Sequence, residues 1–379
     1  MVETRSLVRA QSARKVESSE TMSGVSIAYA VVAALALAPY VVPVPVFVQL
    51  IPTSIMLLYI GCHIGLRNTH RPGESESERI EAKDAYMFPV FGSCALITLY
   101  LAYKFLPPYY LNLIVSLYFF AVGLLSLSSS LKAFVSTLLP LESYQALNAP
   151  VLSFRIPSVI ARWICDKDKK DDDLVQISTI DLPCLAVSAV AAGVYLMTKH
   201  ALSNNVFGYA FSIQAISMIN LDSFWTGAAL LLGLFFYDIF FVFGTDVMVT
   251  VATKFDAPIK LLFSRGADLR PSMLGLGDIV IPGLFISLML RLDHEIHCKS
   301  RSESHFSKPY FTSACIGYFV GIAVTLYIMY AFEHAQPALL YLVPGCLISV
   351  LICSLIRGEF KLLTTFHDHG PVKDTAHLE

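Results

Sequence analysis

The fold is decided by long apolar runs, and the most informative of them reads LLGLFFYDIFFVF from Leu231 to Phe243. Asp238 is the single charged residue in this run. Comparable runs recur along the chain, each close to the ~20 residues that a helix needs to cross a hydrocarbon layer ~30 Å thick. The runs are continuous and do not alternate, which favours helices over the strands of a membrane barrel. The sequence therefore predicts an all-α polytopic membrane protein.

The composition agrees with this class. Of the 379 residues 55% are hydrophobic and only 15% are charged, whereas soluble domains have about 25% charged residues. A net charge of -2 leaves no basic surplus to neutralise phosphates, so nucleic acid is excluded as a main partner. The eight cysteines are scattered without a CxxC pair and are interpreted as buried small hydrophobic residues. We expect no metal ion and no cofactor.

The apolar runs predict about nine transmembrane helices and a division into four regions. Residues 1–24 form a polar, disordered tail, 25–180 hold N-terminal membrane helices and a cytosolic loop, 181–359 form the catalytic membrane core, and 360–379 form a cytosolic tail. The expected membrane segments are 25–42, which is not counted among the nine, and nine spans at 46–66, 87–106, 110–131, 181–198, 203–219, 224–250, 273–290, 311–332 and 336–356.

The first of these segments has three interpretations. Prolines at 39, 43, 45 and 52 interrupt the apolar run from Val25 to Leu66, so the run cannot be one straight helix. Segment 25–42 has a basic flank and ends in Ala36-Leu37-Ala38, as secretory signals do, yet Pro39 disfavours cleavage there. It is an additional span, a re-entrant segment or a signal.

Lysine and arginine residues in the loops predict the orientation. If spans alternate from 46–66, one side holds the loop 132–180, the C-terminal tail and most basic residues near span ends, and we assign that side to the cytosol. The basic residues of the cytosolic side are Arg67, Arg71, Arg79, Lys83, Arg291, Lys299, Arg301 and Lys308. The loop 251–272 then lies in the lumen.

Two carboxylates stand at membrane depth, where an ionisable residue is expensive and is functional by default. Asp238 lies in the middle of one span and Asp278 is placed one to two turns into the next. A short connection makes these spans antiparallel neighbours, which would bring the carboxylates face to face. Held closely in a low dielectric, two acids share one proton and titrate as a pair. One can then take a proton from water while the other protonates a scissile carbonyl oxygen.

Residues beside the two acids suit this chemistry. Gly275 and Gly277 precede Asp278 and leave room for a substrate backbone and for water. Tyr237 adds a hydroxyl group next to Asp238. Close packing of helices is the alternative explanation of the glycines.

A third element begins the last span, at Gln336, Pro337, Ala338 and Leu339. Proline is favoured in the first turn of a helix, and that alone is a sufficient explanation of Pro337. Together with the acidic spans, however, the element predicts free backbone donors and acceptors where a substrate strand must unwind and pair.

These motifs, in this order, resemble the intramembrane aspartyl proteases that include signal peptide peptidase and presenilin. They comprise Tyr237-Asp238 in one span, Gly275-Leu276-Gly277-Asp278 in the next, and Pro337-Ala338-Leu339 before the last. The resemblance extends from about Pro52 to Glu359. It implies a presenilin-like bundle of nine spans, with Asp238 and Asp278 as catalytic residues and Tyr237, Gly275, Leu276, Gly277, Gln336, Pro337, Ala338 and Leu339 as supporting residues.

The resemblance also implies the substrates and the location. They are leftover signal peptides and type II oriented membrane segments, cut in the membrane of the endoplasmic reticulum. The N-terminus would be lumenal and the C-terminus cytosolic. A homo-oligomer and the degradation machinery of the endoplasmic reticulum are partners that such an enzyme allows. The C-terminal Lys373–Glu379 has neither a dilysine nor a KDEL retrieval signal, so this location rests on the resemblance.

Two other functions fit the same acids. A proton- or cation-coupled transporter or channel also places carboxylates near the midplane, with Asp246 or the pair Glu333-His334 as relay groups. An inactive scaffold for degradation is the second alternative. Cleavage that is lost in Asp238→Ala or Asp278→Ala separates the protease from both.

Overall fold

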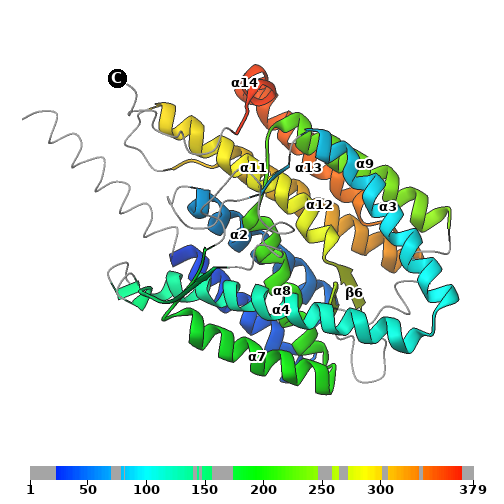
Figure 1. Ribbon diagram of the computed structural model, residues 1–379. Coiled ribbons are helices and arrows are strands. Elements are labelled where there is room, and N and C mark those ends of the chain that lie inside the picture. Colours follow the sequence, from blue (N-terminus) through cyan, green and yellow to red (C-terminus); the bar gives the residue numbers. More distant parts are fainter. Residues whose placement is uncertain are drawn as a thin grey trace, which may run out of the picture.

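The protein is a bundle of long helices, described here by a computed structural model (Figure 1). The described residues are 23–69, 78–80, 82–139, 143–144, 147–155, 174–245, 258–263, 272–300, 306–332 and 336–368. Long helices cover α2 (Val46–Thr69), α3 (Ala82–Phe105), α4 (Pro108–Leu138), α7 (Asp181–Thr198), α8 (Ala201–Met218), α9 (Phe224–Phe243), α11 (Gly277–Ser300), α12 (Pro309–Phe332) and α13 (Leu339–Arg357). A further helical segment, Ser23–Tyr40, ends in the 3-10 turn η1 (Ala38–Tyr40), and the short helix α14 covers Phe360–Thr365.

Each predicted membrane segment corresponds to one of these long helices, and the predicted helical membrane bundle is confirmed. Eight of them, including Ser23–Tyr40, are long and apolar enough to cross a membrane. Helices α8 and α11 are not among the eight, because both carry polar and charged residues, such as Asn204, Asn205 and Arg291, that are buried inside the bundle. Hydropathy therefore misses the two helices whose buried faces carry these polar side chains.

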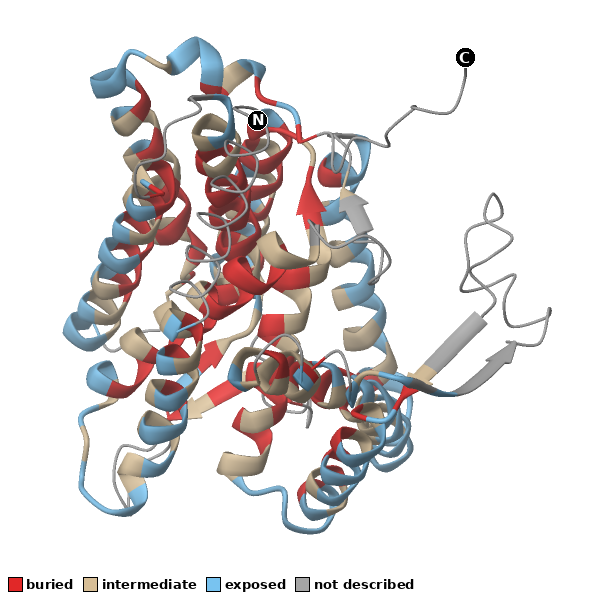
Figure 2. Ribbon diagram, turned by 90° about the vertical axis from the view of Figure 1, so that its left-hand side faces the viewer, coloured by how far each residue is buried: buried red, intermediate tan, exposed pale blue. Residues whose placement is uncertain are grey.

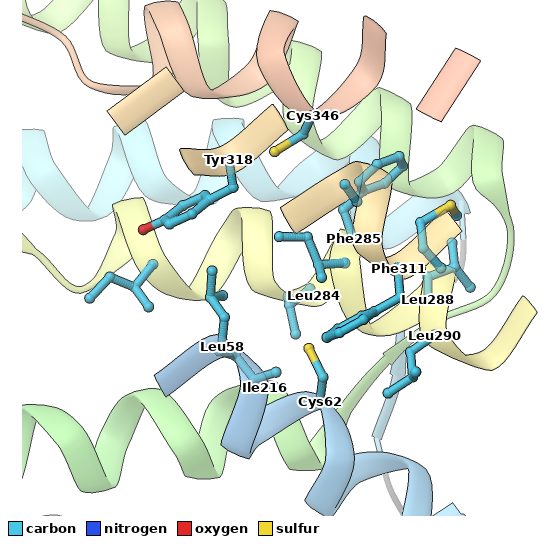
Figure 3. Packing of buried hydrophobic residues seen from close by; sticks show 14 of the residues in the cluster. Leu58, Cys62, Ile216, Leu284, Phe285, Leu288, Leu290, Phe311, Tyr318 and Cys346 are labelled. Carbon is cyan, nitrogen blue, oxygen red and sulfur yellow. The ribbon is translucent and has the colours of Figure 1, made fainter. Parts of the chain in front are cut away.

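The core lies where α2, α8, α11 and α12 meet. Figure 3 shows Leu58 and Cys62 of α2, Ile216 of α8 and Leu284 and Phe285 of α11 packed together. A Cβ atom added at Gly283 would lie only 2.6 Å from Ile216 and 2.7 Å from Leu58, so glycine allows the three helices to approach closely here. In Figure 2 the buried residues follow the inner helices, while the outward faces are exposed. Many of these exposed residues are large and apolar, as expected of lipid-facing surfaces.

The structure corrects several predicted boundaries. The span predicted at 224–250 is helical only to Phe243, and residues 246–250 lie outside the described part. The span predicted at 273–290 begins as a strand, turns helical at Gly277 and continues to Ser300. Pro52 lies inside α2, so the break in the first apolar run falls among Pro39, Pro43 and Pro45. The tail 1–22, residues 156–173 of the predicted loop and the tail 369–379 lie outside the described residues.

Three small sheets connect helix ends. Strand β1 (Glu78–Ile80) pairs in parallel with β4 (Ile219–Leu221), between α8 and α9. Strands β2 (Pro150–Arg155) and β3 (Leu174–Ser178) form an antiparallel pair within the loop predicted at 132–180. Strands β5 (Lys260–Phe263) and β6 (Ser272–Gly275) are antiparallel as well and lead directly into α11. Two-stranded sheets of this size need support from neighbouring helices.

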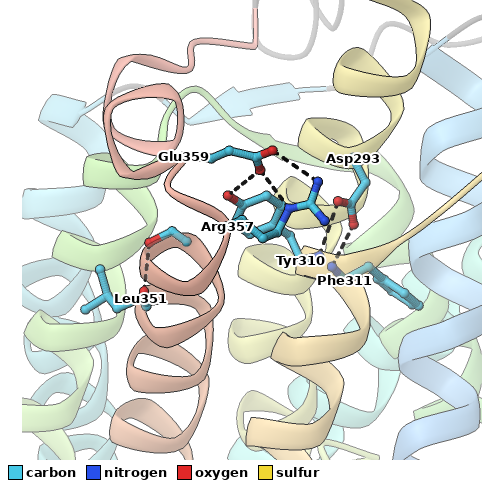
Figure 4. A network of polar contacts seen from close by, with 7 residues as sticks. Asp293, Tyr310, Phe311, Leu351, Arg357 and Glu359 are labelled. Carbon is cyan, nitrogen blue, oxygen red and sulfur yellow. Dashed lines mark hydrogen bonds and ion pairs between the residues drawn. The ribbon is translucent and has the colours of Figure 1, made fainter. Parts of the chain in front are cut away.

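A polar network joins the ends of α11, α12 and α13 (Figure 4). The Asp293 carboxylate accepts hydrogen bonds from the backbone N–H groups of Tyr310 at 3.2 Å and Phe311 at 2.8 Å. It thereby satisfies unpaired donors in the first turn of α12, where negative charge is stabilising. Glu359 accepts from Arg357 at 2.8 Å and from the Tyr310 hydroxyl at 3.0 Å. The hydrogen bond from Arg357 lowers the pKa of the Glu359 carboxyl.

The segment after α14 returns to the bundle at the same end. Arg291 and Asp368 form a buried ion pair at 2.8 Å, and Asp368 N–H donates to the Asp222 carbonyl at 2.8 Å. His367 lies 3.4 Å from the Asp222 carboxylate. These contacts attach residues 366–368 to the start of α9 and to the end of α11.

Candidate active site

The first candidate acid, Asp238, faces the interior of the bundle from α9. The helix begins at Phe224 after the N-cap Ser223, whose hydroxyl accepts from the Thr226 N–H at 3.3 Å. Phe236 and Phe240 are 65% and 60% exposed, whereas Asp238 is only 6% exposed. Because residues two apart lie on nearly opposite sides of a helix, the phenylalanines face outward and the carboxylate faces inward.

The second candidate acid, Asp278, lies in the first turn of α11. The sequence predicted a deeper position, one to two turns into the span, which is wrong because 272–275 form strand β6 rather than helix. Backbone N–H groups in a first helical turn lack partners within the helix and favour an acidic side chain. Gly275, at the end of β6, lies close to the Asp278 carboxylate. Asp278 retains partial exposure.

The structure brings the two acids and the third sequence element together. Asp278 lies close enough to Asp238 for the two side chains to interact electrostatically. The backbone N–H of Leu339 donates to Oδ2 of Asp238 at 3.2 Å. Leu339 is the first residue of α13, so its N–H has no acceptor within the helix. Three segments that are far apart in the sequence therefore meet at one pair of carboxylates.

The supporting residues of the third element surround this contact. Pro337 and Leu339 are buried, while Gln336 and Ala338 are partly exposed. The sequence predicted Pro337 in the first turn of the last span, but α13 begins only at Leu339 with Ala338 as its N-cap. Pro337 still contributes, because its carbonyl accepts from the Leu340 N–H at 3.2 Å and thereby helps to form the first turn.

The residues beside the acids have different neighbours. The Tyr237 ring packs against Phe241 at 4.7 Å between centroids and lies near Gly92 of α3. A Cβ atom at Gly275 would come within 3.3 Å of Asp278 Oδ2, so a side chain there would crowd the acid. A Cβ atom at Gly277 would meet only Ile281, at 3.7 Å, so packing does not require glycine at that position.

The sequence interpretation did not identify the hairpin β5–β6. Each strand has four residues, and an apolar run this short cannot be told from the start of a buried helix by periodicity. The relay groups considered for a transporter, Asp246 and Glu333-His334, lie outside the described residues. Within the described part of the chain, no group of three or more His, Cys, Asp or Glu side chains could hold a metal ion.

The helical bundle and its paired carboxylates define the class of a polytopic membrane protein with an internal acidic site. The family model for signal peptide peptidase matches residues 73–370. The chain is 37% identical to mouse signal peptide peptidase over 338 residues, which are 87% of this chain and 85% of the mouse protein. It is 38% identical to human signal peptide peptidase over 339 residues, 86% of this chain and 84% of that protein.

A third relative is a probable intramembrane protease of Schizosaccharomyces pombe, 35% identical over 320 residues that cover 84% of this chain and 93% of the relative. The chain belongs to the signal peptide peptidase family. The expected family is thus confirmed, and membership supports a peptidase that works in the membrane.

Proposed function

We propose that the protein is an intramembrane aspartic endopeptidase whose catalytic residues are Asp238 and Asp278. The observation that supports this proposal is the hydrogen bond from the first backbone donor of α13, the Leu339 N–H, to Asp238 Oδ2 at 3.2 Å, with Asp278 close enough to Asp238 to interact with it electrostatically. Intramembrane acids without basic partners are rare and mark functional sites.

The two carboxylates divide the proton transfers between them. The ionised member takes a proton from a water molecule as the water oxygen attacks the scissile carbonyl carbon. The protonated member gives its proton to the carbonyl oxygen, and collapse of the tetrahedral intermediate returns a proton to the leaving amine. The buried Asp238 is held by the Leu339 N–H, and in this proposal water reaches the pair from the side of the partly exposed Asp278.

The substrates follow from the position of the site. A substrate helix must uncoil locally before cleavage, because its carbonyl groups are engaged in its own hydrogen bonds. We propose that signal peptides left in the membrane of the endoplasmic reticulum, and other type II oriented segments, are cut in this way. The basic loops assign the ends of α11 and α13, and the attached segment 366–368, to the cytosolic side.

The number of spans decides on which side of the membrane the N-terminus lies. With α2 as the first span the N-terminus is lumenal, and with Ser23–Tyr40 as an additional span it is cytosolic. Val25, Ala28 and Val32 of this additional helix are buried against the bundle, which supports its retention as part of the folded protein. A homo-oligomer and contact with the degradation machinery of the endoplasmic reticulum belong to the same proposal.

Cleavage by the purified chain in lipid vesicles tests the function. A signal-peptide substrate should yield two products with the wild-type chain and none with Asp238→Ala or Asp278→Ala. Ion or proton flux without cleavage would instead favour a transporter or channel. Cleavage that persists in both variants would remove the acids from the mechanism.

A further inference from the structure

A pair of asparagines in α8 holds the outer edge of the hairpin β5–β6. Asn204 Nδ2 donates to the Lys260 carbonyl at 2.7 Å. Asn205 makes two bonds with one residue: its Nδ2 donates to the Leu262 carbonyl at 2.8 Å, and its Oδ1 accepts from the Leu262 N–H at 2.8 Å. Both asparagine side chains are buried, at 5% and 7% exposure.

The geometry of these bonds resembles that of a neighbouring strand. Residues 260 and 262 have backbone groups on the edge that faces α8. Residues 261 and 263 therefore turn their backbone groups toward β6, where they pair with Leu274 and Ser272. A side-chain amide offers one donor and one acceptor, as a residue of an adjacent strand does, so Asn205 occupies the place of a third strand.

Helix α8 is shaped for this contact. Gly208 lies on the same face, one turn after Asn204 and Asn205, and a Cβ atom there would clash with the Leu261 side chain. The helix therefore reaches the hairpin closely enough for short side chains to bond its backbone. Burying two adjacent asparagines is costly unless their amides are hydrogen-bonded, and the hairpin provides partners for both polar atoms of Asn205 and for Nδ2 of Asn204.

The hairpin in turn places Asp278. Strand β6 ends at Gly275, and the Leu276 N–H donates to the Ile259 carbonyl at 3.0 Å, so the pairing continues almost to the start of α11. The last residue of β6 also lies beside the acid, since a Cβ atom on Gly275 would be 3.3 Å from Asp278 Oδ2. The asparagine side chains, the β5–β6 pairing and the Leu276 bond therefore connect α8 to the start of α11, which carries Asp278.

We propose that Asn204 and Asn205 are positioning residues that hold the hairpin in place and thereby set Asp278 opposite Asp238. This inference rests on the proposed protease function. Neither asparagine takes part in the chemistry. Their role is to fix the backbone from which one reacting group extends, and small displacements of such a group reduce the rate steeply.

Nearly isosteric substitutions test the role. Asn205→Leu removes two bonds to Leu262, and Asn204→Leu removes one to Lys260. We expect kcat to fall about a hundredfold in the first and about tenfold in the second, as misplacement of a reacting group predicts, with KM within about twofold of wild type. Ser212→Ala is the matched control, because Ser212 is equally buried in α8 but bonds only the Gly208 carbonyl of its own helix. The Ser212→Ala variant should have the same kcat as the wild type.

Restoration by a cross-link separates positioning from a loss of stability. Leu262 and Met273 lie opposite each other in a pair whose backbone groups face outward, and Cα atoms in such pairs are about 4.5 Å apart, which suits a disulfide. Leu262→Cys with Met273→Cys, added to Asn205→Leu, should restore most of kcat when oxidised and lose it again with a reductant.

Each outcome decides the inference. A cross-link that does not form would refute the register, and one that forms without restoring kcat would refute positioning. A rise in KM at constant kcat would assign the asparagines to substrate binding instead. If Asp278→Ala is inactive while Asn205→Leu matches the wild type, only this inference fails. If Asp278→Ala is active, the proposed protease function fails and this inference fails with it.

Discussion

The strongest prediction concerns how the two acids depend on each other. We expect Asp238→Asn and Asp278→Asn each to lower the single-turnover cleavage rate by about 10²–10⁴, the usual contribution of general acid–base catalysis. This corresponds to about 2.7–5.5 kcal/mol of transition-state stabilisation. Because the acids work on one proton as a unit, the double variant should be no slower than the slower single variant.

The structure makes asparagine an informative replacement. The side chain keeps nearly the same volume, and its amide oxygen can still accept from the Leu339 N–H that now bonds Asp238 at 3.2 Å. The fold around the site should therefore survive, and the lost rate should reflect the lost carboxylate. The assay uses a fluorogenic signal-peptide substrate in vesicles with the enzyme in excess. Under these conditions it measures the rate of the cleavage step without a contribution from product release.

Asp293→Asn is the matched control, since Asp293 is a buried acid on the same helix as Asp278 but caps α12. It should reduce stability by about 0.5–2 kcal/mol, as the loss of a helix cap does, and keep the cleavage rate. Two results would refute the reasoning: a single Asp238 or Asp278 variant with more than about a tenth of the wild-type rate, or rate losses that multiply in the double variant.

Three further predictions follow from the described contacts. Asp368→Ala should destabilise the fold by about 3–5 kcal/mol, because it breaks the buried ion pair with Arg291; thermal unfolding in detergent measures this, and an unchanged midpoint would contradict it. The pKa of Glu359 is lower in the folded state than in the unfolded one, so its stabilising contribution is present above the unfolded pKa and lost as the pH falls through the folded pKa. Glu359→Gln should therefore flatten the acid limb of a thermal-stability profile, and an identical limb would argue against the Arg357 contact. A proline placed near the cut site of a substrate should speed cleavage, because it opens the substrate helix. Equal cleavage rates for the substrates with and without this proline would show that unwinding does not limit the reaction.

The comparison of sequence and structure is clearest at the third element. The pattern at 336–339 predicted free backbone donors, but it did not say what they bond. The hydrogen bond from Leu339 to Asp238 joins residues that are 101 positions apart in the sequence. A local sequence pattern does not specify a partner so far along the chain. The depth of Asp278 was misplaced for a related reason, since the strand before it depends on pairing with β5 and on support from α8.

Local chemistry was sufficient for the helical class, for most span positions and for the two candidate acids. Apolar runs of membrane length permit few structures in lipid, because every backbone polar group must be hydrogen-bonded within the segment. An acid in such a run indicates a functional residue, because placing it in the membrane costs free energy. The tertiary structure alone decided which helices lie inside, where the hairpin β5–β6 forms and which backbone groups reach Asp238 and Asp278. These features depend on contacts between segments distant in sequence, and the burial of Asn204 and Asn205 has a physical reason only once their partners on β5 are known.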